Sequence, residues 1–232
     1  MTEQLLWKPF TLTYITYPAD DSLYSPLLAL LSLFPPFGVC ALTTATLIYK
    51  DVIAAFLLLG CLFSAFIGAI LKRMIQQPRP DRYDNEDKNM EYGMPSNHSC
   101  FAWFCCTFVM MYVVKRGSMV AECQMPSRNC KGIIANTTKL HLAKNLTKIW
   151  NFMHNSLAII LALFIAIGCS YSRIYLGYHT LAQVYAGSCL GTILGISWYQ
   201  LFEMKLVRNL LARVNGIITQ LECQRQEDGK TD

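Results

Sequence analysis

Five runs of apolar residues, each about as long as a bilayer is thick, constrain this chain more than any other feature of its sequence. They cover roughly residues 26–49, 52–71, 98–114, 155–172 and 181–202. A helix needs about 20 predominantly apolar residues to cross the hydrocarbon core. Hydrophobic residues make up 53% of the chain and charged residues only 15%, which also points to a membrane protein. We therefore predict an all-α, multi-pass transmembrane bundle of about five spans.

Small residues interrupt the second run, which makes it only moderately apolar. Gly60, Ser64 and Gly68 recur every four residues and share one helix face, which favours close helix packing in lipid. The third run is short and needs Trp103 at the interface to complete a span. We divide the chain into a membrane-embedded domain at residues 1–202 and a cytoplasmic tail, amphipathic or disordered, at residues 203–232.

The tail carries apolar residues at three- and four-residue steps, with charged residues between them. The apolar positions are Leu206, Leu210, Val214, Ile217 and Leu221. Such spacing is typical of an amphipathic helix that lies on a membrane surface. A simple extension of the fifth span is the alternative interpretation.

With five spans, the basic residues divide unevenly between the two sides of the membrane. Seven of the twenty lie with the N-terminus and with segments 72–98 and 173–180. The other thirteen lie with the 50–51 turn, segment 115–154 and the tail. Basic residues concentrate on the cytoplasmic side of membrane proteins. We therefore expect segments 72–98 and 173–180 on the lumenal or extracellular side. The net charge of +5 reflects this asymmetry rather than nucleic-acid binding.

Two histidines lie where a polar loop meets an apolar run. His98 follows Pro95 and Ser96, a good N-cap, and so falls in the first turn of the third span. Free backbone N–H groups and the positive helix end make that turn a natural phosphate site. His179 opens the fifth span. His141 and His154 belong to no comparable pattern and are interpreted as interfacial polar residues.

Cations accompany both histidines. Arg173 ends the fourth span, and a short loop would return its guanidinium to the end where His179 lies, as a planar fork for phosphate oxygens. Gln183 lies four residues after His179 on the same helix face and can hold the imidazole by a hydrogen bond. Lys72 and Arg79 bracket the end of the second span, with prolines on both sides of Arg79 that stiffen its backbone.

No metal site is predicted. The acidic residues Asp81, Asp84, Glu86 and Asp87 are spaced loosely in a loop and are interpreted as a solvated charge run rather than a magnesium site. Most of the ten cysteines lie in apolar runs, where cysteine behaves as a small hydrophobe. A Cys123–Cys130 bridge is the less favoured alternative for that pair.

Three of these patterns together resemble the signatures of the type 2 phosphatidic-acid phosphatase superfamily. They are Lys-x6-Arg-Pro at 72–80, Pro-Ser-x-His at 95–98 and Ser-Arg-x5-His at 172–179, in that order. Segments 17–19, 92–96, 103–104 and 171–180 narrow the resemblance to the dolichyldiphosphatases of that superfamily. The match covers most of residues 8–200.

The resemblance implies a role for each site residue. His179 would attack the terminal phosphorus to give a phosphohistidine, and His98 would protonate the departing lipid phosphate. The phosphate oxygens would be held by Lys72, Arg79, Arg173, Ser96 and the backbone near Asn97, without a metal or other cofactor. Two departures from the superfamily pattern are Asn97, where glycine is common, and Gln183, where an aspartate usually orients the nucleophile. A neutral amide fixes a tautomer but adds no charge, so the role of Gln183 stays open.

The implied activity is hydrolysis of dolichyl diphosphate at the lumenal face of the endoplasmic reticulum membrane, recycling the lipid carrier of N-glycosylation. The expected partners are a polyisoprenoid diphosphate lipid and the membrane, with no nucleic acid and no obligate protein partner. A broader phosphatase acting on phosphatidate or sphingoid phosphates is one alternative. A non-catalytic membrane protein that binds phospholipid is another.

Overall fold

The computed structural model describes residues 7–9, 16–18, 24–80, 92–123 and 137–228. These parts of the chain form seven helices and one two-stranded antiparallel sheet, in which β1 (Trp7–Pro9) pairs with β2 (Thr16–Pro18). The helices are α1 (Tyr24–Ser32), α2 (Phe34–Leu47), α3 (Val52–Ile75), α4 (Asn97–Cys123), α5 (Thr137–Tyr175), α6 (Leu181–Glu203) and α7 (Lys205–Asp228). Apart from the small sheet, the predicted helical fold is confirmed.

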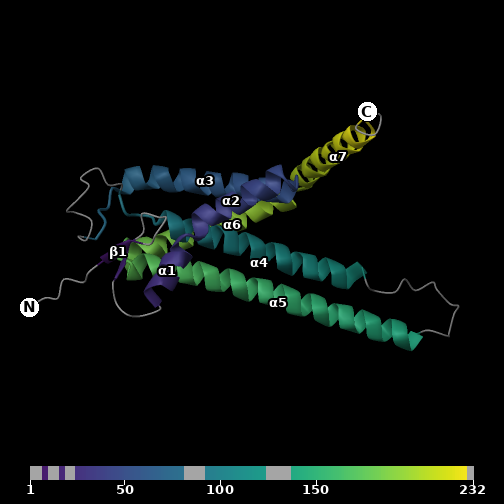
Figure 1. Ribbon diagram of the computed structural model, residues 1–232, viewed down its shortest axis with the longest axis horizontal. Coiled ribbons are helices and arrows are strands. Elements are labelled where there is room, and N and C mark those ends of the chain that lie inside the picture. The colour runs from purple at the N-terminus through teal and green to yellow at the C-terminus, as the bar shows by residue number, and fades with distance from the viewer. Residues whose placement is uncertain (1–6, 10–15, 19–23, 81–91, 124–136, 229–232) are drawn as a thin grey trace, which may run out of the picture.

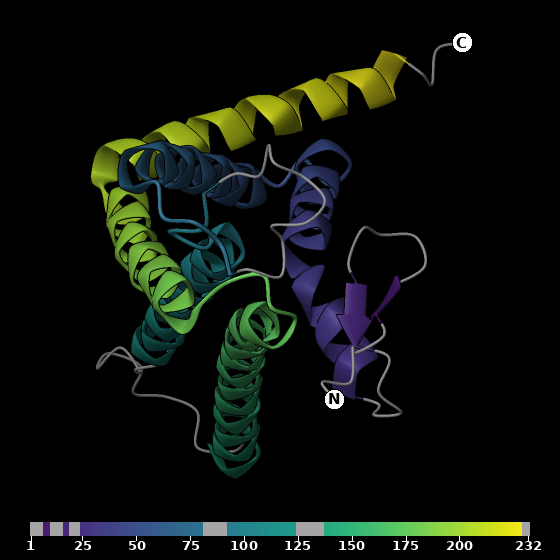
Figure 2. The same cartoon turned by 90° about the vertical axis from the view of Figure 1, so that its left-hand side faces the viewer.

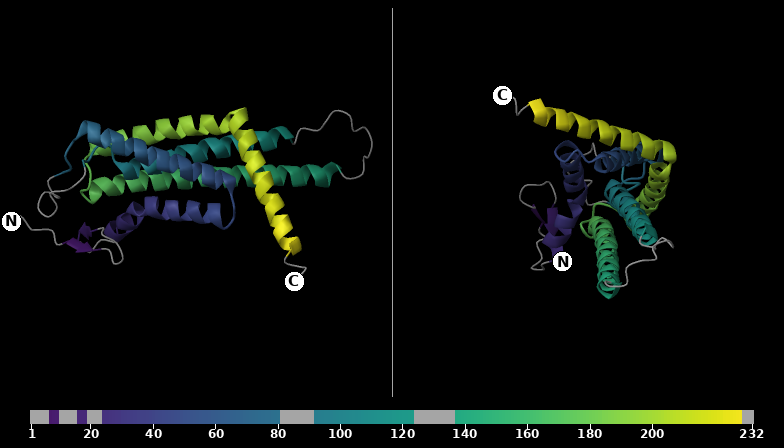
Figure 3. Two further views of the ribbon diagram at one scale, coloured as in Figure 1. Left: turned by 90° about the horizontal axis from the view of Figure 1, so that it is seen from above. Right: turned by 90° about the vertical axis from the view of Figure 1, so that its right-hand side faces the viewer.

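Helices α3 to α6 run side by side as a bundle, with α4 packed against α3, α5 and α6 (Figure 1 and Figure 3). Among the described residues, α3, Asn97–Arg116 of α4 and Ile149–Tyr175 of α5 are long and apolar enough to cross a membrane. The bent pair α1 and α2 makes a fourth candidate span. The 23-residue α6 falls outside that group and lies beside α4 in the same bundle. The prediction of about five spans therefore holds as an approximation.

The first apolar run is broken rather than continuous. α1 and α2 meet at Leu33 with a bend of 44°, and two prolines occupy the first turn of α2. Proline lacks the N–H that would continue the hydrogen bonds of a preceding helix, so a new helix starts there. The bend lets α1 lie against α5, where the Ser25 hydroxyl is 2.9 Å from the Tyr175 hydroxyl.

The third and fourth runs extend well beyond their predicted ends. α4 continues to Cys123 and α5 begins at Thr137, so much of segment 115–154, treated as a loop in the sequence, is helical. The apolar pattern marks only the part of a helix within the hydrocarbon core, whereas charged residues with good helix propensity can continue it into water. The Cys123–Cys130 alternative involves residues 124–136, which lie outside the described parts.

The tail forms the predicted amphipathic helix and does not extend α6. Met204 between them is extended, with φ −61° and ψ 131°. As a result, α7 crosses the end of the bundle at a steep angle to α6 (Figure 2 and Figure 3). The predicted apolar positions of α7, from Leu206 to Leu221, are exposed.

Two sets of small residues bring the helices into close contact. The predicted face of Gly60, Ser64 and Gly68 is buried on α3, where the Ser64 hydroxyl lies 3.2 Å from the Cys100 sulfur of α4. On α6, three glycines at the same four-residue spacing face the backbone of α4. They are Gly187 opposite Ser96, Gly191 opposite Cys100 and Gly195 opposite Phe104. A Cβ on Gly187 or Gly191 would collide with the facing carbonyl oxygen, so glycine sets the distance between α4 and α6.

Candidate active site

The three sequence motifs meet at one end of the bundle. The end of α3, the start of α4, the end of α5 and the start of α6 lie together at the left of Figure 1. Lys72, Ser96, Arg173 and His179 are all buried there, and each has at most 6% of its surface exposed. Buried cations and a buried imidazole at one point are costly unless they serve a ligand of opposite charge.

Arg173 is held from two sides. One guanidinium nitrogen, Nη1, donates to the Ser32 hydroxyl at 2.6 Å, and the guanidinium carbon lies 4.1 Å from the centre of the Tyr178 ring. Within the described parts of the chain, the buried Nε of Arg173 has no hydrogen-bond partner. This N–H is therefore a donor available to an anion.

The turn between α5 and α6 fixes His179 relative to Arg173. The backbone N–H groups of Tyr178 and His179 donate to the Arg173 carbonyl at 3.0 and 3.1 Å. Gly177 allows this return of the chain because its φ of 70° is one that glycine adopts without strain. Arg173 and His179 thus belong to one hydrogen-bonded turn.

His179 is uncharged at neutral pH. Burial, together with the nearby cations Arg173, Arg79 and Lys72, lowers its pKa to about 3, although the hydrogen bond with Gln183 acts in the opposite direction. Desolvation and like charges both disfavour the imidazolium. A neutral imidazole retains the lone pair that a nucleophile needs.

Gln183 determines which ring nitrogen carries that lone pair. Its Nε2 donates to the Pro78 carbonyl at 2.8 Å, and its Oε1 accepts from the Thr180 backbone N–H at 3.3 Å. A carbonyl only accepts and a backbone N–H only donates, so the orientation of the amide is fixed. The Oε1 atom, 3.1 Å from His179 Nδ1, must then accept from Nδ1–H. The lone pair of His179 is therefore on Nε2.

The same glutamine joins all three motifs. It is fully buried, and its backbone carbonyl accepts from the Ser96 N–H at 3.1 Å. Gly93 packs so closely against it that a Cβ there would lie 2.5 Å from the amide nitrogen. With Thr180, Gln183 also forms the capping box at the start of α6. The predicted bond to His179 is present, and further hydrogen bonds join Gln183 to Gln77, Pro78, Ser96 and Thr180.

Helix α4 begins at Asn97, directly after the predicted N-cap residue Ser96. Ser96 precedes the helix and is fully buried, its hydroxyl accepting from the Ser99 hydroxyl at 3.3 Å. Asn97 is the first helical residue and does not use the left-handed backbone that asparagine tolerates. Its Oδ1 lies against Gly68, so its backbone N–H rather than its side chain is what the helix start offers. His98 follows in the first turn.

The first motif is split between a helix end and an extended segment. Lys72 is buried in the last turn of α3, whereas Arg73 is exposed, as expected for an interfacial anchor. Gln76 ends α3 in a left-handed conformation with φ 51°, and the chain then extends through the half-buried Arg79. Both Lys72 and Arg79 are near enough to His179 to lower its pKa.

No group of three or more potential metal ligands occurs among the described residues. Asp81, Asp84, Glu86 and Asp87 lie outside them. Seven cysteines, at 40, 61, 100, 105, 106, 169 and 189, are free thiols. What the described site offers is a neutral imidazole, a second imidazole, three cations and a helix N-terminus.

Sequence reasoning missed three contributors to this site. Ser32 holds Arg173, Tyr178 lies against its guanidinium, and the Pro78 carbonyl orients the Gln183 amide. A serine within the apolar 26–49 run was the only signal for Ser32. Nothing in the sequence marks the Pro78 carbonyl.

A family model described as the PAP2 superfamily matches residues 53–206, which include every candidate site residue. Dolichyldiphosphatase 1 of Homo sapiens is 30% identical over 208 residues, covering 90% of this chain and 76% of that protein. Lipid phosphate phosphatase gamma of Arabidopsis thaliana is 32% identical over 193 residues, covering 83% and 72%.

Among solved structures, the chain resembles the crystal structure of a transmembrane PAP2-type phosphatidylglycerolphosphate phosphatase from Bacillus subtilis. The TM-score is 0.51 at 19% identity, covering 76% of this chain and 75% of that one. At that identity, the likeness concerns the fold.

Proposed function

Since this chain belongs to the PAP2 superfamily, we propose that it is a dolichyldiphosphatase, which hydrolyses dolichyl diphosphate to dolichyl phosphate and inorganic phosphate. The observation that carries the proposal is the neutral His179, held in one tautomer near the buried cations Lys72 and Arg173. The human relative and the Saccharomyces cerevisiae dolichyldiphosphatase, 28% identical over 207 residues, support the choice of substrate.

In the first step, the Nε2 lone pair of His179 attacks the terminal phosphorus. An N–P bond forms as the bond from phosphorus to the bridging oxygen breaks, and His98 gives its proton to that oxygen on the departing dolichyl phosphate. The negative charge of the substrate favours the protonated form of His98 that this step needs. Gln183 keeps the Nδ1–H of His179 engaged while the imidazolium exists.

In the second step, water replaces the imidazole. His98, now neutral, takes a proton from the water as its oxygen attacks phosphorus, and the N–P bond breaks to release inorganic phosphate. Each step needs the charge on the transferred phosphoryl group to be balanced as the bonds change. Lys72, Arg79, the free Nε–H of Arg173 and the helix start at Ser96–Asn97 are the groups placed to balance it.

We also propose that the enzyme works in the endoplasmic reticulum membrane with its site facing the lumen, returning the carrier lipid for N-glycosylation. The unequal distribution of basic residues supports this orientation. It places residues 203–232 and the far end of α5 in the cytoplasm. Asn136 and Asn145 each begin an Asn-x-Thr sequence, the acceptor pattern for N-glycosylation. Both would then stay unglycosylated, and a mobility shift on endoglycosidase treatment of the expressed protein would contradict the orientation.

Histidine variants test the catalytic assignment. His179→Ala should abolish release of phosphate from dolichyl diphosphate and trapping of a phosphoenzyme, and His98→Ala should slow departure of the lipid phosphate. His154→Ala is the matched control, because His154 is an exposed residue of α5 remote from the three motifs. A folded His179→Ala protein with near-normal turnover would refute the nucleophile.

The Arabidopsis relative, by its name a lipid phosphate phosphatase, supports a second candidate function, a broader phosphatase that accepts phosphatidate. Competition between dolichyl diphosphate, dolichyl monophosphate and phosphatidate on the purified protein separates the two. A dolichyldiphosphatase should have at least about a tenfold higher kcat/KM for the diphosphate, a preference equal to about 1.4 kcal/mol.

A further inference from the structure

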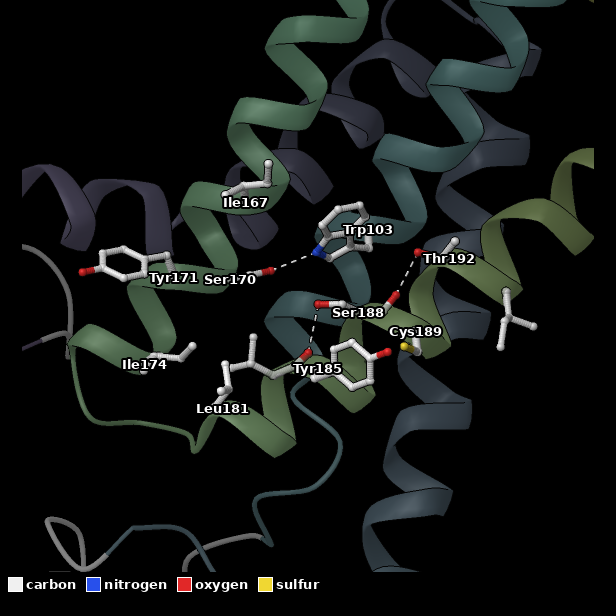
Figure 4. Close-up of a pocket in the computed structure, with 12 residues that line it drawn as sticks. Trp103, Ile167, Ser170, Tyr171, Ile174, Leu181, Tyr185, Ser188, Cys189 and Thr192 are labelled. Atoms are coloured by element: carbon white, nitrogen blue, oxygen red, sulfur yellow. Dashed lines mark hydrogen bonds between the residues drawn. The ribbon is translucent and has the colours of Figure 1, made fainter.

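An apolar groove opens between α5 and α6, beside the candidate active site (Figure 4). It has a volume of about 560 Å³, and Trp103 of α4 lies at its back. Its outer edges are the exposed side chains of Tyr171, Leu181 and Tyr185, which would face lipid. None of the catalytic groups lines it.

The groove begins at the catalytic turn and runs towards the middle of the bundle. Ile174 follows Arg173 directly, and Leu181 lies two residues after His179. From Leu181 to Ile193 the groove follows α6 for roughly 18 Å, at 1.5 Å per residue. On α4 it reaches Trp103, five residues beyond His98. A chain attached to the leaving phosphate would enter this groove without passing through the cation cluster.

The serine and threonine hydroxyls and the indole N–H in the groove are engaged in hydrogen bonds. Ser188 donates to the Val184 carbonyl and Thr192 to the Ser188 carbonyl, both at 2.9 Å. The Ser170 hydroxyl accepts from the Trp103 indole N–H at 3.1 Å (Figure 4). With these hydrogen bonds in place, the groove presents mainly hydrocarbon and aromatic surface to an occupant.

Resting on the proposed function, we infer that this groove is a subsite for the isoprenoid chain of dolichyl diphosphate. An isoprenoid diphosphate is hydrocarbon from its first carbon, so its chain matches a groove that becomes apolar at the catalytic turn. Phosphatidate carries ester oxygens close to its phosphate, which would meet Ile174 and Leu181 there. A buried acceptor without a hydrogen bond is unfavourable, so the groove discriminates against diacyl lipids.

The occupied groove would also orient the reaction. A chain lying between α5 and α6 holds the attached phosphate at the turn that carries Arg173 and His179. Anchoring of a remote, unreactive part of a substrate is used to position its reacting atoms. The groove thus contributes to kcat/KM for long chains and contributes little for a diphosphate without one.

Ser188→Trp tests the subsite by filling it. The purified variant is assayed in mixed micelles on dolichyl diphosphate and on the five-carbon isopentenyl diphosphate. We expect the ratio of kcat/KM for the long chain to that for the short one to fall at least about tenfold, which corresponds to losing the burial of only two methylene groups. Ser197→Trp is the matched control, because Ser197 is exposed on α6, bonds the Ile193 carbonyl at 2.9 Å and lies outside the groove.

An unchanged ratio in Ser188→Trp, or the same fall in Ser197→Trp, would overturn the subsite. The proposed function fails differently: the wild-type protein would then not prefer dolichyl diphosphate to phosphatidate. If Ser188→Trp does not fold, photolabelling of the wild-type protein tests the subsite instead. A photoreactive farnesyl diphosphate should label residues 167–193, and dolichyl diphosphate should compete with the labelling. Labelling confined to α1, α2 or α3 would refute the inference.

Discussion

Gly187→Ala should damage both stability and catalysis through one added methyl group. The Cβ would collide with the Ser96 carbonyl oxygen and lie 3.1 Å from the Ser96 nitrogen, both of them backbone atoms that no rotamer change can move. To relieve the collision, α6 must move away from α4 or the start of α4 must shift. Overpacking of this kind costs about 1–3 kcal/mol.

Gly216→Ala isolates that cost. Gly216 is also a helical glycine, but a Cβ there would meet nothing within 4 Å. Replacing glycine by alanine in a helix gains about 1 kcal/mol from propensity alone, and both variants receive it. The difference between their free energies of unfolding therefore measures the contact, and we expect Gly187→Ala to be the less stable by about 1–3 kcal/mol.

The catalytic effect follows from the position of Ser96, whose N–H bonds the Gln183 carbonyl and whose carbonyl accepts the first bond of α4. Displacement of a reacting group by about 1 Å can cost about 100-fold in rate. We expect kcat of Gly187→Ala to fall about 10- to 100-fold, with Gly216→Ala unchanged. Thermal unfolding in one detergent and phosphate release from dolichyl diphosphate measure the two effects. Equal stability and equal kcat in the two variants would refute the packing argument.

Three further outcomes are expected. Gln183→Glu places a carboxylate beside Nδ1 of His179 and so raises the pKa of the imidazole from about 3. The acid limb of the kcat/KM profile, measured from about pH 4 to pH 8, should therefore move to higher pH. An acid limb that does not move would exclude the contact between the two side chains. Ser32→Ala removes the acceptor for Arg173 Nη1 and should lower kcat/KM about tenfold. Ser32→Thr keeps a hydroxyl at this position and should restore the activity. If Ser32→Thr does not restore it, the loss in Ser32→Ala reflects a packing defect. Excess EDTA should leave turnover unchanged, because the proposed mechanism uses only histidines and cations. Loss of turnover that added magnesium reverses would contradict this mechanism.

The spans were predictable because lipid demands long apolar segments, and the convergence of the three motifs was predictable because each motif lies near the end of a span. Gln183 and His179 lie four residues apart on one helix face, and their hydrogen bond needed only that geometry. The far ends of α4 and α5 were missed because charged helices in water carry no apolar signal.

Contacts between distant segments could not be predicted. Ser32 meets Arg173 across 141 residues because α1 bends away from α2 and packs on α5. The Pro78 carbonyl meets Gln183 across 105 residues. In both cases the local sequence is compatible with many partners, and the tertiary packing selects one.

The bond from Gln183 to the Pro78 carbonyl links the hold on His179 to the segment that follows α3. Without the segment after α3 in place, the amide keeps the Thr180 N–H but loses the Pro78 carbonyl, so its orientation and the tautomer of His179 are held less firmly. Local opening of residues 76–80 would therefore loosen the hold on His179 and displace Arg79 while the bundle stays folded. Hydrogen exchange of that segment then becomes a measure of the fraction of molecules ready to react.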